Sequence, residues 1–190
     1  MTTDYILGFF LGIGLAASVG FRVFVPLFIL SLGAHFNIVD LNENWIWLGE
    51  KPALILLGIA TIIEALAYVI PFLDNLLDTI ALPLATVAGT LIVVATSIDM
   101  SPVFLWTLAI IAGGGTATAV KGVTSSTRLV STTTTGGVAN PLISSVETGT
   151  SIVISVITIF LPIIGFLIAL VIFFYLRRFY RFLFAKKDTV

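Results

Sequence analysis

Long apolar runs alternate with short polar connections along the chain. The runs at 53–70, 79–98 and 102–120 each approach the roughly 20 residues that an α-helix needs to cross the hydrocarbon core of a bilayer. Apolar and polar residues do not alternate within these runs, as they would in the strands of a transmembrane barrel. The pattern therefore predicts an all-α fold, a polytopic transmembrane helical bundle.

The first and the last apolar regions are too long for one straight helix each. Residues 5–34 would form a helix of about 45 Å, against a hydrocarbon core of about 30 Å, so we expect a break at SVGFRVFVP. Residues 141–176 are expected to form a hairpin of two helices that turns near LPIIG. With residues 5–34 as one tilted, broken crossing the chain has about six spans, and a re-entrant hairpin over the same residues is the alternative.

Small residues recur at every fourth position near the N-terminus. Gly8, Gly12, Ala16 and Gly20 form a stripe that lets another helix approach closely. In a homo-oligomer, which we expect for so small a chain, this stripe offers a subunit interface.

Two short segments hint at internal repetition. GLAASVGFR at 14–22 resembles GTATAVKGV at 115–123, and each half of the chain later holds a helix with one glutamate. Three spans in each half would give a 3+3 inverted repeat, as in many secondary transporters. Chance similarity between segments rich in small residues is the alternative.

Charge is scarce and unevenly placed. Charged residues make up 10% of the chain, against about 25% in soluble domains, so a soluble fold is excluded. The basic run RRFYRFLFAKK near the C-terminus predicts that this end is cytoplasmic. We therefore divide the chain into a transmembrane domain, 1–176, and a basic tail, 177–190, that lies against anionic lipids or serves only as a topology anchor. The tail's five cations are Arg177, Arg178, Arg181, Lys186 and Lys187.

Two glutamates lie within apolar segments, where a carboxylate costs at least about 2.5 kcal/mol. Glu64 shares a helical face with Thr61 and Tyr68. Glu147 belongs to a polar stripe whose members recur every three or four residues: Ser144, Glu147, Thr148, Ser151, Ser155 and Thr158. Both glutamates are expected to face the bundle interior, either along an ion or proton path or in structural pairs, such as Glu64 with Arg22.

A hydroxyl-rich tract with two cations follows the fourth apolar run. Thr118, Lys121, Ser125, Arg128, Thr132 and Thr135 share one helical face. This face suits an anion or a lipid phosphate, because arginine binds such groups through two parallel hydrogen bonds. The alternative is a pair of cations reaching the interface, with hydroxyls bonded back to their own helix. GGVANP should then end this helix and begin the next.

The sequence contains few residues that could form a metal site or an enzyme active site. Asp74 and Asp78 are four residues apart and could hold Mg²⁺ for chemistry on a lipid phosphate, but the second acidic motif that such enzymes need is not visible, and an ordinary solvated turn is the favoured explanation. His35 is the only histidine and cysteine is absent, which excludes sites made of several histidines or of thiolates. We expect no cofactor, no metal centre and no nucleic-acid partner.

Four segments carry a family resemblance. They are GLAASVGFRVFVPLFILSLGAH, DNLLDTIALPLATVAGTLI, SPVFLWTLAIIAGGGTATAVKG and STTTTGGVANPLISSVETG. In this order they resemble the domain of unknown function 4126 family of small bacterial integral membrane proteins, over nearly the whole chain apart from the basic tail. The resemblance implies a multi-pass protein of the bacterial inner membrane and transfers no catalytic or ligand-binding residue.

Three functions remain open at this point. The first is a small secondary transporter or channel for a small or anionic solute, or a lipid headgroup, and not an enzyme. Its pathway would be lined by Arg22, Glu64, Lys121, Arg128, Thr132, Glu147 and Ser151. The second is a structural or assembly protein, and the third is an intramembrane enzyme acting on lipid phosphates.

Overall fold

The computed structural model describes residues 2–68, 71–98 and 100–184. These residues form eight α-helices, one 3₁₀ helix and one π-helical segment, with no strand among them, which confirms the all-α class. The α-helices are α1 (Thr2–Val19), α2 (Phe24–His35), α3 (Lys51–Ala67), α4 (Pro71–Thr96), α5 (Pro102–Leu108), α6 (Gly115–Thr135), α7 (Asn140–Phe160) and α8 (Pro162–Phe184). The 3₁₀ helix η1 is Glu43–Gly49 and the π-helical segment η2 is Ala109–Gly114.

Among the residues that the structure describes, three helical segments are long and apolar enough to cross a bilayer: Thr79–Thr96, Pro102–Thr135 and Asn140–Phe160. A fourth candidate span arises if η1 and α3, whose axes differ in direction by 64°, are counted together as one broken span. Shorter apolar helices are Ile6–Val19, Phe24–His35 and Pro162–Tyr175. The chain is therefore a membrane-embedded helical protein, whereas the expected six spans are not confirmed.

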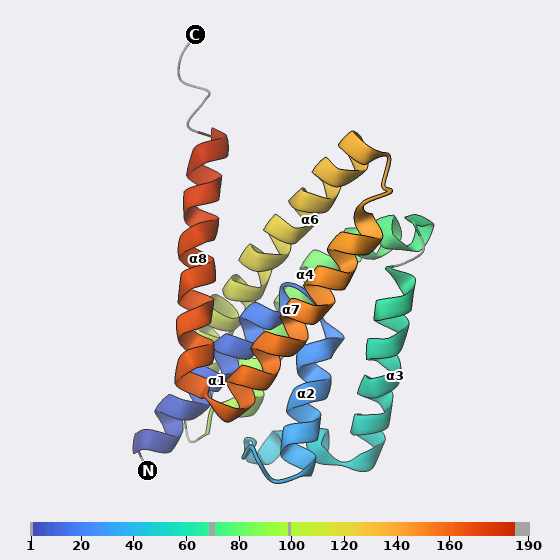
Figure 1. Ribbon diagram of the computed structural model, residues 1–190. Coiled ribbons are helices and arrows are strands. Elements are labelled where there is room, and N and C mark those ends of the chain that lie inside the picture. Colours follow the sequence, from blue (N-terminus) through green and yellow to red (C-terminus); the bar gives the residue numbers. More distant parts are fainter. Residues whose placement is uncertain (1, 69–70, 99, 185–190) are drawn as a thin grey trace.

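The break expected in residues 5–34 is present, but the expected single crossing is wrong. Helix α1 rises from the N-terminus into the middle of the molecule, and α2 runs back down beside it (Figure 1). The start of α1 and the segment after α2 consequently line one cavity, through Leu7 and Gly8 on one side and Val39 and Asp40 on the other. Residues 5–34 form a re-entrant hairpin, because the non-helical residues 20–23 reverse the chain instead of merely tilting it.

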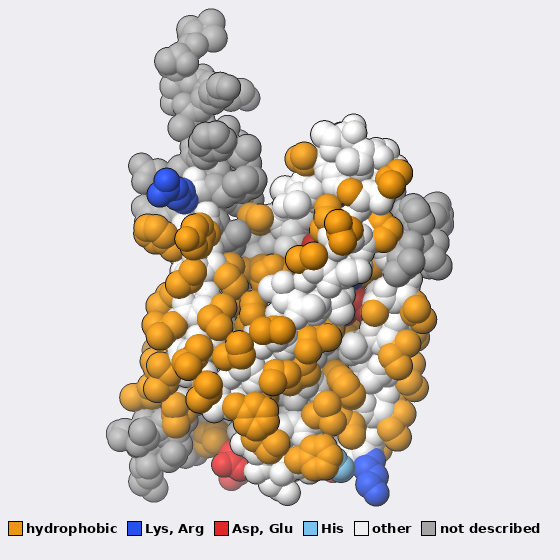
Figure 2. Space-filling view, viewed as in Figure 1, with side chains coloured by type: hydrophobic (Ala, Val, Ile, Leu, Met, Phe, Trp, Pro, Cys, Tyr) orange, Lys and Arg blue, Asp and Glu red, His pale blue; other side chains and the backbone are white. Residues whose placement is uncertain are grey.

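The two ends of the molecule differ in chemistry. We call the end that carries the connection 36–50 the tryptophan end, because Trp45 and Trp47 lie in η1 there. Asn42 fixes this connection to the end of α4 by donating its backbone N–H to the Ala95 carbonyl at 2.8 Å. Between the ends, apolar side chains lie on much of the surface over α3, α7 and α8, and the most exposed charged side chains on this face lie near the ends (Figure 2).

The other two expected breaks are confirmed. Helix α7 ends at Phe160 and α8 begins at Pro162, so LPIIG contains the turn between them. Helix α6 ends at Thr135 and is followed by Gly136, whose φ of 63° is in the left-handed region that glycine adopts without strain. Pro141 then lies in the first turn of α7, where its missing N–H leaves no helical hydrogen bond unmade.

Segment 102–135 is one continuous helical stretch of 34 residues, or about 51 Å. Within it, η2 passes α4 at backbone contact distance. An added Cβ at Gly113 would overlap the carbonyl oxygen of Gly89, and one at Gly89 would lie 2.6 Å from the Cβ of Ala117. Only glycine allows this approach, so α4 and the α5–α6 segment pack more closely than larger residues permit.

The small-residue stripe of α1 faces its own chain, so the subunit interface expected there is wrong. A Cβ at Gly8 would overlap the carbonyl oxygen of Thr96, and one at Gly20 would overlap Val120. The internal repeat is not confirmed either. Its first segment, 14–22, runs into the break after α1, whereas its second, 115–123, continues as helix within α6.

Candidate functional site

The tip of the re-entrant hairpin lies against α3, α6 and α7, and a cluster of charged side chains forms there. Arg22 at the tip and Lys121 and Arg128 on α6 are each at most 2% exposed. Glu64 on α3 and Glu147 on α7 are also buried. Five of the seven residues that sequence analysis assigned to a pathway thus come together; we call these five residues, with Tyr68, the charged cluster.

Glu147 is shared by two arginines. It accepts hydrogen bonds from Nε of Arg128, at 3.2 Å, and from Nη2 of Arg128. Nη2 of Arg22 lies 3.9 Å from the same Oε2 of Glu147. This paired geometry is the strong form of an arginine–carboxylate contact, and it joins α6, α7 and the hairpin tip.

Arg22 fastens the hairpin tip to α7. Its Nε donates to Oγ1 of Thr148 at 2.9 Å, and its Nη2 donates to the carbonyl oxygen of Ser144 at 2.9 Å and to the Ser144 hydroxyl. Its Nη1 is buried and has no hydrogen-bond partner among the described residues. A guanidinium can occupy this depth because the helix break and α7 supply polar atoms on several sides.

Glu64 caps the broken helix. Its Oε1 accepts from the backbone N–H of Val23 at 2.9 Å, and its Oε2 accepts from that of Phe24 at 3.0 Å. The first N–H groups of a helix have no partner within the helix, and a carboxylate there also interacts favourably with the helix dipole. The alternative pairing of Glu64 with Arg22 is therefore wrong: Glu64 binds the backbone, and Arg22 pairs with Glu147.

Tyr68 is the residue that sequence reasoning missed. The Cζ atoms of Arg22 and Arg128 lie 4.0 and 4.2 Å from the centroid of its ring. Nζ of Lys121 lies 3.4 Å from its hydroxyl oxygen. Cation–π contact with three cations makes Tyr68 the centre of the charged cluster. The signal available was its position four residues after Glu64, on the same face of the helical segment.

The polar stripe of α7 packs against α1. Ser18 of α1 contacts the hydroxyl groups of Ser151 at 3.0 Å and Ser155 at 2.6 Å, and all three residues are fully buried. Thr158 adjoins Gly14 and Gly165, which leave room for it. The pathway candidate Ser151 is therefore hydrogen-bonded to the hairpin.

The hydroxyl-rich tract is helical up to Thr135. The pathway candidate Thr132 accepts a hydrogen bond from Nδ2 of Asn140 at 3.0 Å. Many of its other hydroxyls donate to carbonyl groups of their own helix, as the alternative reading of this tract expected; they belong to Thr118, Ser126, Thr127, Thr133, Thr134 and Thr135.

The remaining candidates lie apart from the charged cluster or beyond the described side chains. Nδ1 of His35 lies 2.8 Å from the carbonyl oxygen of Gly49, at the tryptophan end. The side chains of Asp74 and Asp78 are outside the described ones, as are those of Arg177 and Arg181; Lys186 and Lys187 lie beyond the last described residue. Among the residues that the structure describes, no group of three or more His, Cys, Asp or Glu could hold a metal ion.

The cap on α2 can be tested directly. Replacing Glu64 by alanine is expected to lower the free energy of unfolding by about 0.5–2 kcal/mol, the usual cost of losing a helix cap. It should also speed hydrogen exchange at the amides of Val23 and Phe24, which lose their acceptors. Exchange measured by mass spectrometry in detergent checks this, with the exposed Glu50→Ala as control. Unchanged protection at Val23 and Phe24 would contradict the cap.

Comparison with known proteins gives one match. The family model described as "Domain of unknown function (DUF4126)" matches residues 9–181, a range that includes the whole charged cluster. No curated protein matches the chain. No solved structure matches it.

Proposed function

The chain belongs to the family described as a domain of unknown function (DUF4126), and we propose that it is a small secondary transporter or channel for a small or anionic solute. The observation that carries the proposal is the helix break between α1 and α2, whose tip holds Arg22 and is capped by Glu64. Broken helices in membrane transporters place helix ends and charged groups at the substrate or coupling site.

The charged cluster has the chemistry of a coupling site for an anion. Glu147 neutralises Arg128 and lies near Arg22, so both arginines depend on one carboxylate. A proton taken up at Oε2 of Glu147 would remove that charge. A solute anion could then bind the two guanidinium groups in place of the carboxylate. When the anion leaves, Glu147 would release the proton and pair with the arginines again. Proton and anion would thus move together.

We place the protein in the bacterial inner membrane with the C-terminus in the cytoplasm. The acidic residues Asp40, Glu43 and Glu50 lie at the tryptophan end, whereas the basic run RRFYRFLFAKK begins in the last part of α8, at the opposite end. The positive-inside rule favours this orientation. With α1 and α2 as a re-entrant hairpin, the N-terminus lies on the tryptophan side. A homo-oligomer stays part of the proposal, with an interface other than the stripe of α1.

Flux measurements in proteoliposomes test the transport proposal. Vesicles would contain the pH-sensitive dye pyranine, and gradients of chloride, nitrate, phosphate or methanesulfonate would be applied. We expect one of these anions to drive proton movement in the wild type, and Glu147→Gln to abolish that coupling while the exposed Glu50→Gln retains it. Transport is contradicted if the wild type moves none of these anions, and the coupling role is contradicted if Glu64→Gln and Glu147→Gln both leave every flux unchanged.

A structural role is the second candidate, and the contact between α7 and α1 favours it. The fully buried Ser18, Ser151 and Ser155 join the hairpin to α7 through hydroxyl groups, as interhelical hydrogen bonds do in membrane proteins. If the protein is a scaffold, Glu147→Gln should lower its thermal stability in detergent, and the wild type should show no anion flux. The combination of the two measurements separates the candidates.

A further inference from the structure

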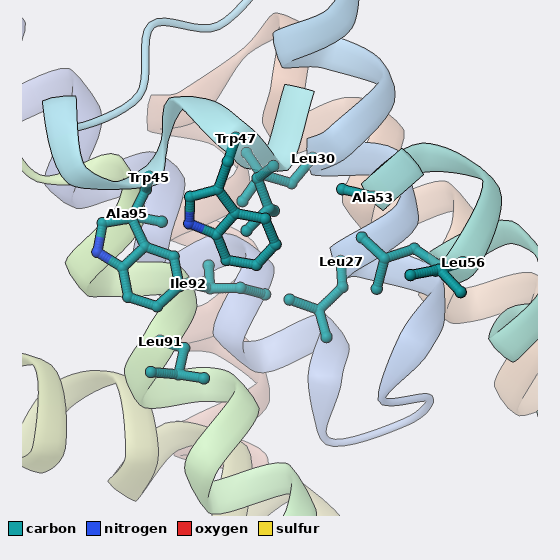
Figure 3. Close-up of a pocket in the computed structure, with 11 residues that line it drawn as sticks. Leu27, Leu30, Trp45, Trp47, Ala53, Leu56, Leu91, Ile92 and Ala95 are labelled. Carbon is teal, nitrogen blue, oxygen red and sulfur yellow. The ribbon is translucent and has the colours of Figure 1, made fainter. Parts of the chain in front are cut away.

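The side of α3 that faces α4 is poorly covered. Helix α3 packs along α2 but touches α4 at few positions. Two cavities, each of about 250 Å³, lie where α2, α3 and α4 meet. One is at the tryptophan end, between Trp45, Trp47 and the side chains of the three helices (Figure 3). The other ends at Glu64 and Tyr68 of the charged cluster.

Both cavities belong to one seam along the same faces of the helices. Ala53 and Leu57 line the first cavity, and Ala60, Glu64 and Ala67 line the second. Their spacings of four, three, four and three residues place them on one face of α3. From Ala53 to Ala67 the seam extends 14 residues along α3, or about 21 Å at 1.5 Å per residue.

The walls of the seam present no unpaired charge to a ligand. The first cavity is lined only by apolar side chains. In the second, Glu64 is occupied by the backbone N–H groups of Val23 and Phe24, and the Tyr68 hydroxyl by Lys121. Burial of an apolar chain is therefore the favourable interaction that the seam provides.

The rim of the seam is open towards the bilayer. Leu56, Ile63 and Ile80 line the cavities and are still 67%, 60% and 50% exposed. In a membrane these side chains face lipid chains. Trp47, at the mouth of the first cavity, is 52% exposed and is of the residue type found at headgroup level.

We propose that the seam between α3 and α4 binds an acyl chain of a membrane lipid, with the headgroup at Trp45 and Trp47 and the chain directed towards Tyr68. The length of the seam, about 21 Å, exceeds half of a hydrocarbon core of about 30 Å, so it holds a chain of one leaflet. The bound chain fills the space that α4 leaves beside α3. It thereby keeps α3 against α2, with Glu64 in place at the start of α2.

Tryptophan quenching by brominated lipid tests the site. Trp47→Phe with Trp106→Phe leaves Trp45 as the only tryptophan, at the wall of the first cavity. In nanodiscs containing phosphatidylcholine brominated along its chains, we expect Trp45 fluorescence to fall in proportion to the brominated fraction, as exchange of lipid at one site requires. A free tryptophan analogue in the same lipid contacts several lipids at once, so its fluorescence should fall more steeply at low brominated fractions. This behaviour distinguishes a site from random contact with bulk lipid.

Filling the cavity provides the matched comparison. Ala53→Phe should abolish the single-site quenching, whereas Ile55→Phe, at a position that is 61% exposed and lines neither cavity, should preserve it. Leu91→Phe, on the α4 side, replaces Ala53→Phe if that variant does not fold. Native mass spectrometry should show a retained lipid in the parent and its loss in the filled variant.

Two results would overturn the proposal. Fluorescence that falls as steeply with brominated fraction as that of the free analogue and is unchanged by Ala53→Phe and Leu91→Phe would show that no lipid site exists at the seam. Quenching that appears only when the protein is diluted to one copy per nanodisc would assign the seam to a second copy of the chain. Neither result depends on whether the protein transports a solute.

Discussion

Glu147→Gln is expected to lower the free energy of unfolding by about 3–5 kcal/mol, the usual cost of removing one partner of a buried ion pair. Arg128 and Arg22 would lose the carboxylate that they share, at a depth where water cannot replace it. Equilibrium unfolding in detergent, followed by circular dichroism, measures the loss. Glu50→Gln, which removes an exposed carboxylate at the tryptophan end, should change the free energy by no more than about 0.5 kcal/mol.

A double-mutant cycle shows whether the loss comes from the pair itself. Arg128→Met combined with Glu147→Leu replaces both charges by apolar groups of similar length, which is often neutral or even stabilising for a buried pair. The double variant should therefore be more stable than the sum of the two single losses predicts, with a coupling energy of about 0.5–3 kcal/mol. Additive losses would mean that Arg128 and Glu147 do not stabilise each other.

Gly113→Leu is expected to destabilise the fold by about 1–3 kcal/mol or more, the range for overpacking a filled interface. Its new side chain would collide with the carbonyl oxygen of Gly89 and with Cγ2 of Val93, and backbone atoms cannot move aside as a flexible side chain can. Thermal unfolding in detergent checks the expectation, and loss of the folded protein on purification would be its extreme form.

Gly115→Leu is the matched control for this packing prediction. Gly115 lies two residues further along the same helical segment, is exposed, and has no atom within 4 Å of an added Cβ. The variant also exchanges glycine for a better helix former, which slightly favours the folded state. Equal destabilisation by both substitutions would contradict a specific contact between η2 and α4.

Local backbone chemistry explains why three helix boundaries could be predicted. SVGFRVFVP, LPIIG and GGVANP each contain both glycine and proline, which favour helix ends and helix starts, and the structure has a boundary in each stretch. The direction taken after a break is not a local property. Residues 20–23 could continue α1 or reverse it, and the contacts of α1 with the end of α4 and of α2 with η1 decide for reversal.

The sequence identifies which residues of the candidate site are energetically costly in a membrane, but not how these residues are arranged. Charges in apolar segments identify Arg22, Glu64 and Glu147 from sequence, because each must be compensated within the protein. The expected pair of Glu64 with Arg22 does not form: Glu64 meets backbone N–H groups, and Arg22 lies near Glu147. Tyr68 could be placed on the face of Glu64 from sequence, but only the packing of the helices brings two guanidinium groups onto its ring.

The sequence by itself determined that this is an all-α membrane protein, where three of its helix boundaries lie, and which side chains are too polar for lipid. Hydropathy, glycine and proline act locally, so these properties can be read along the chain. Only the tertiary structure decided that the first two helices form a re-entrant hairpin and that Arg22 meets Ser144, 122 residues away. The reason is that a polar group in a bilayer is satisfied by whichever donor or acceptor helix packing brings within reach, and that packing joins segments far apart in sequence.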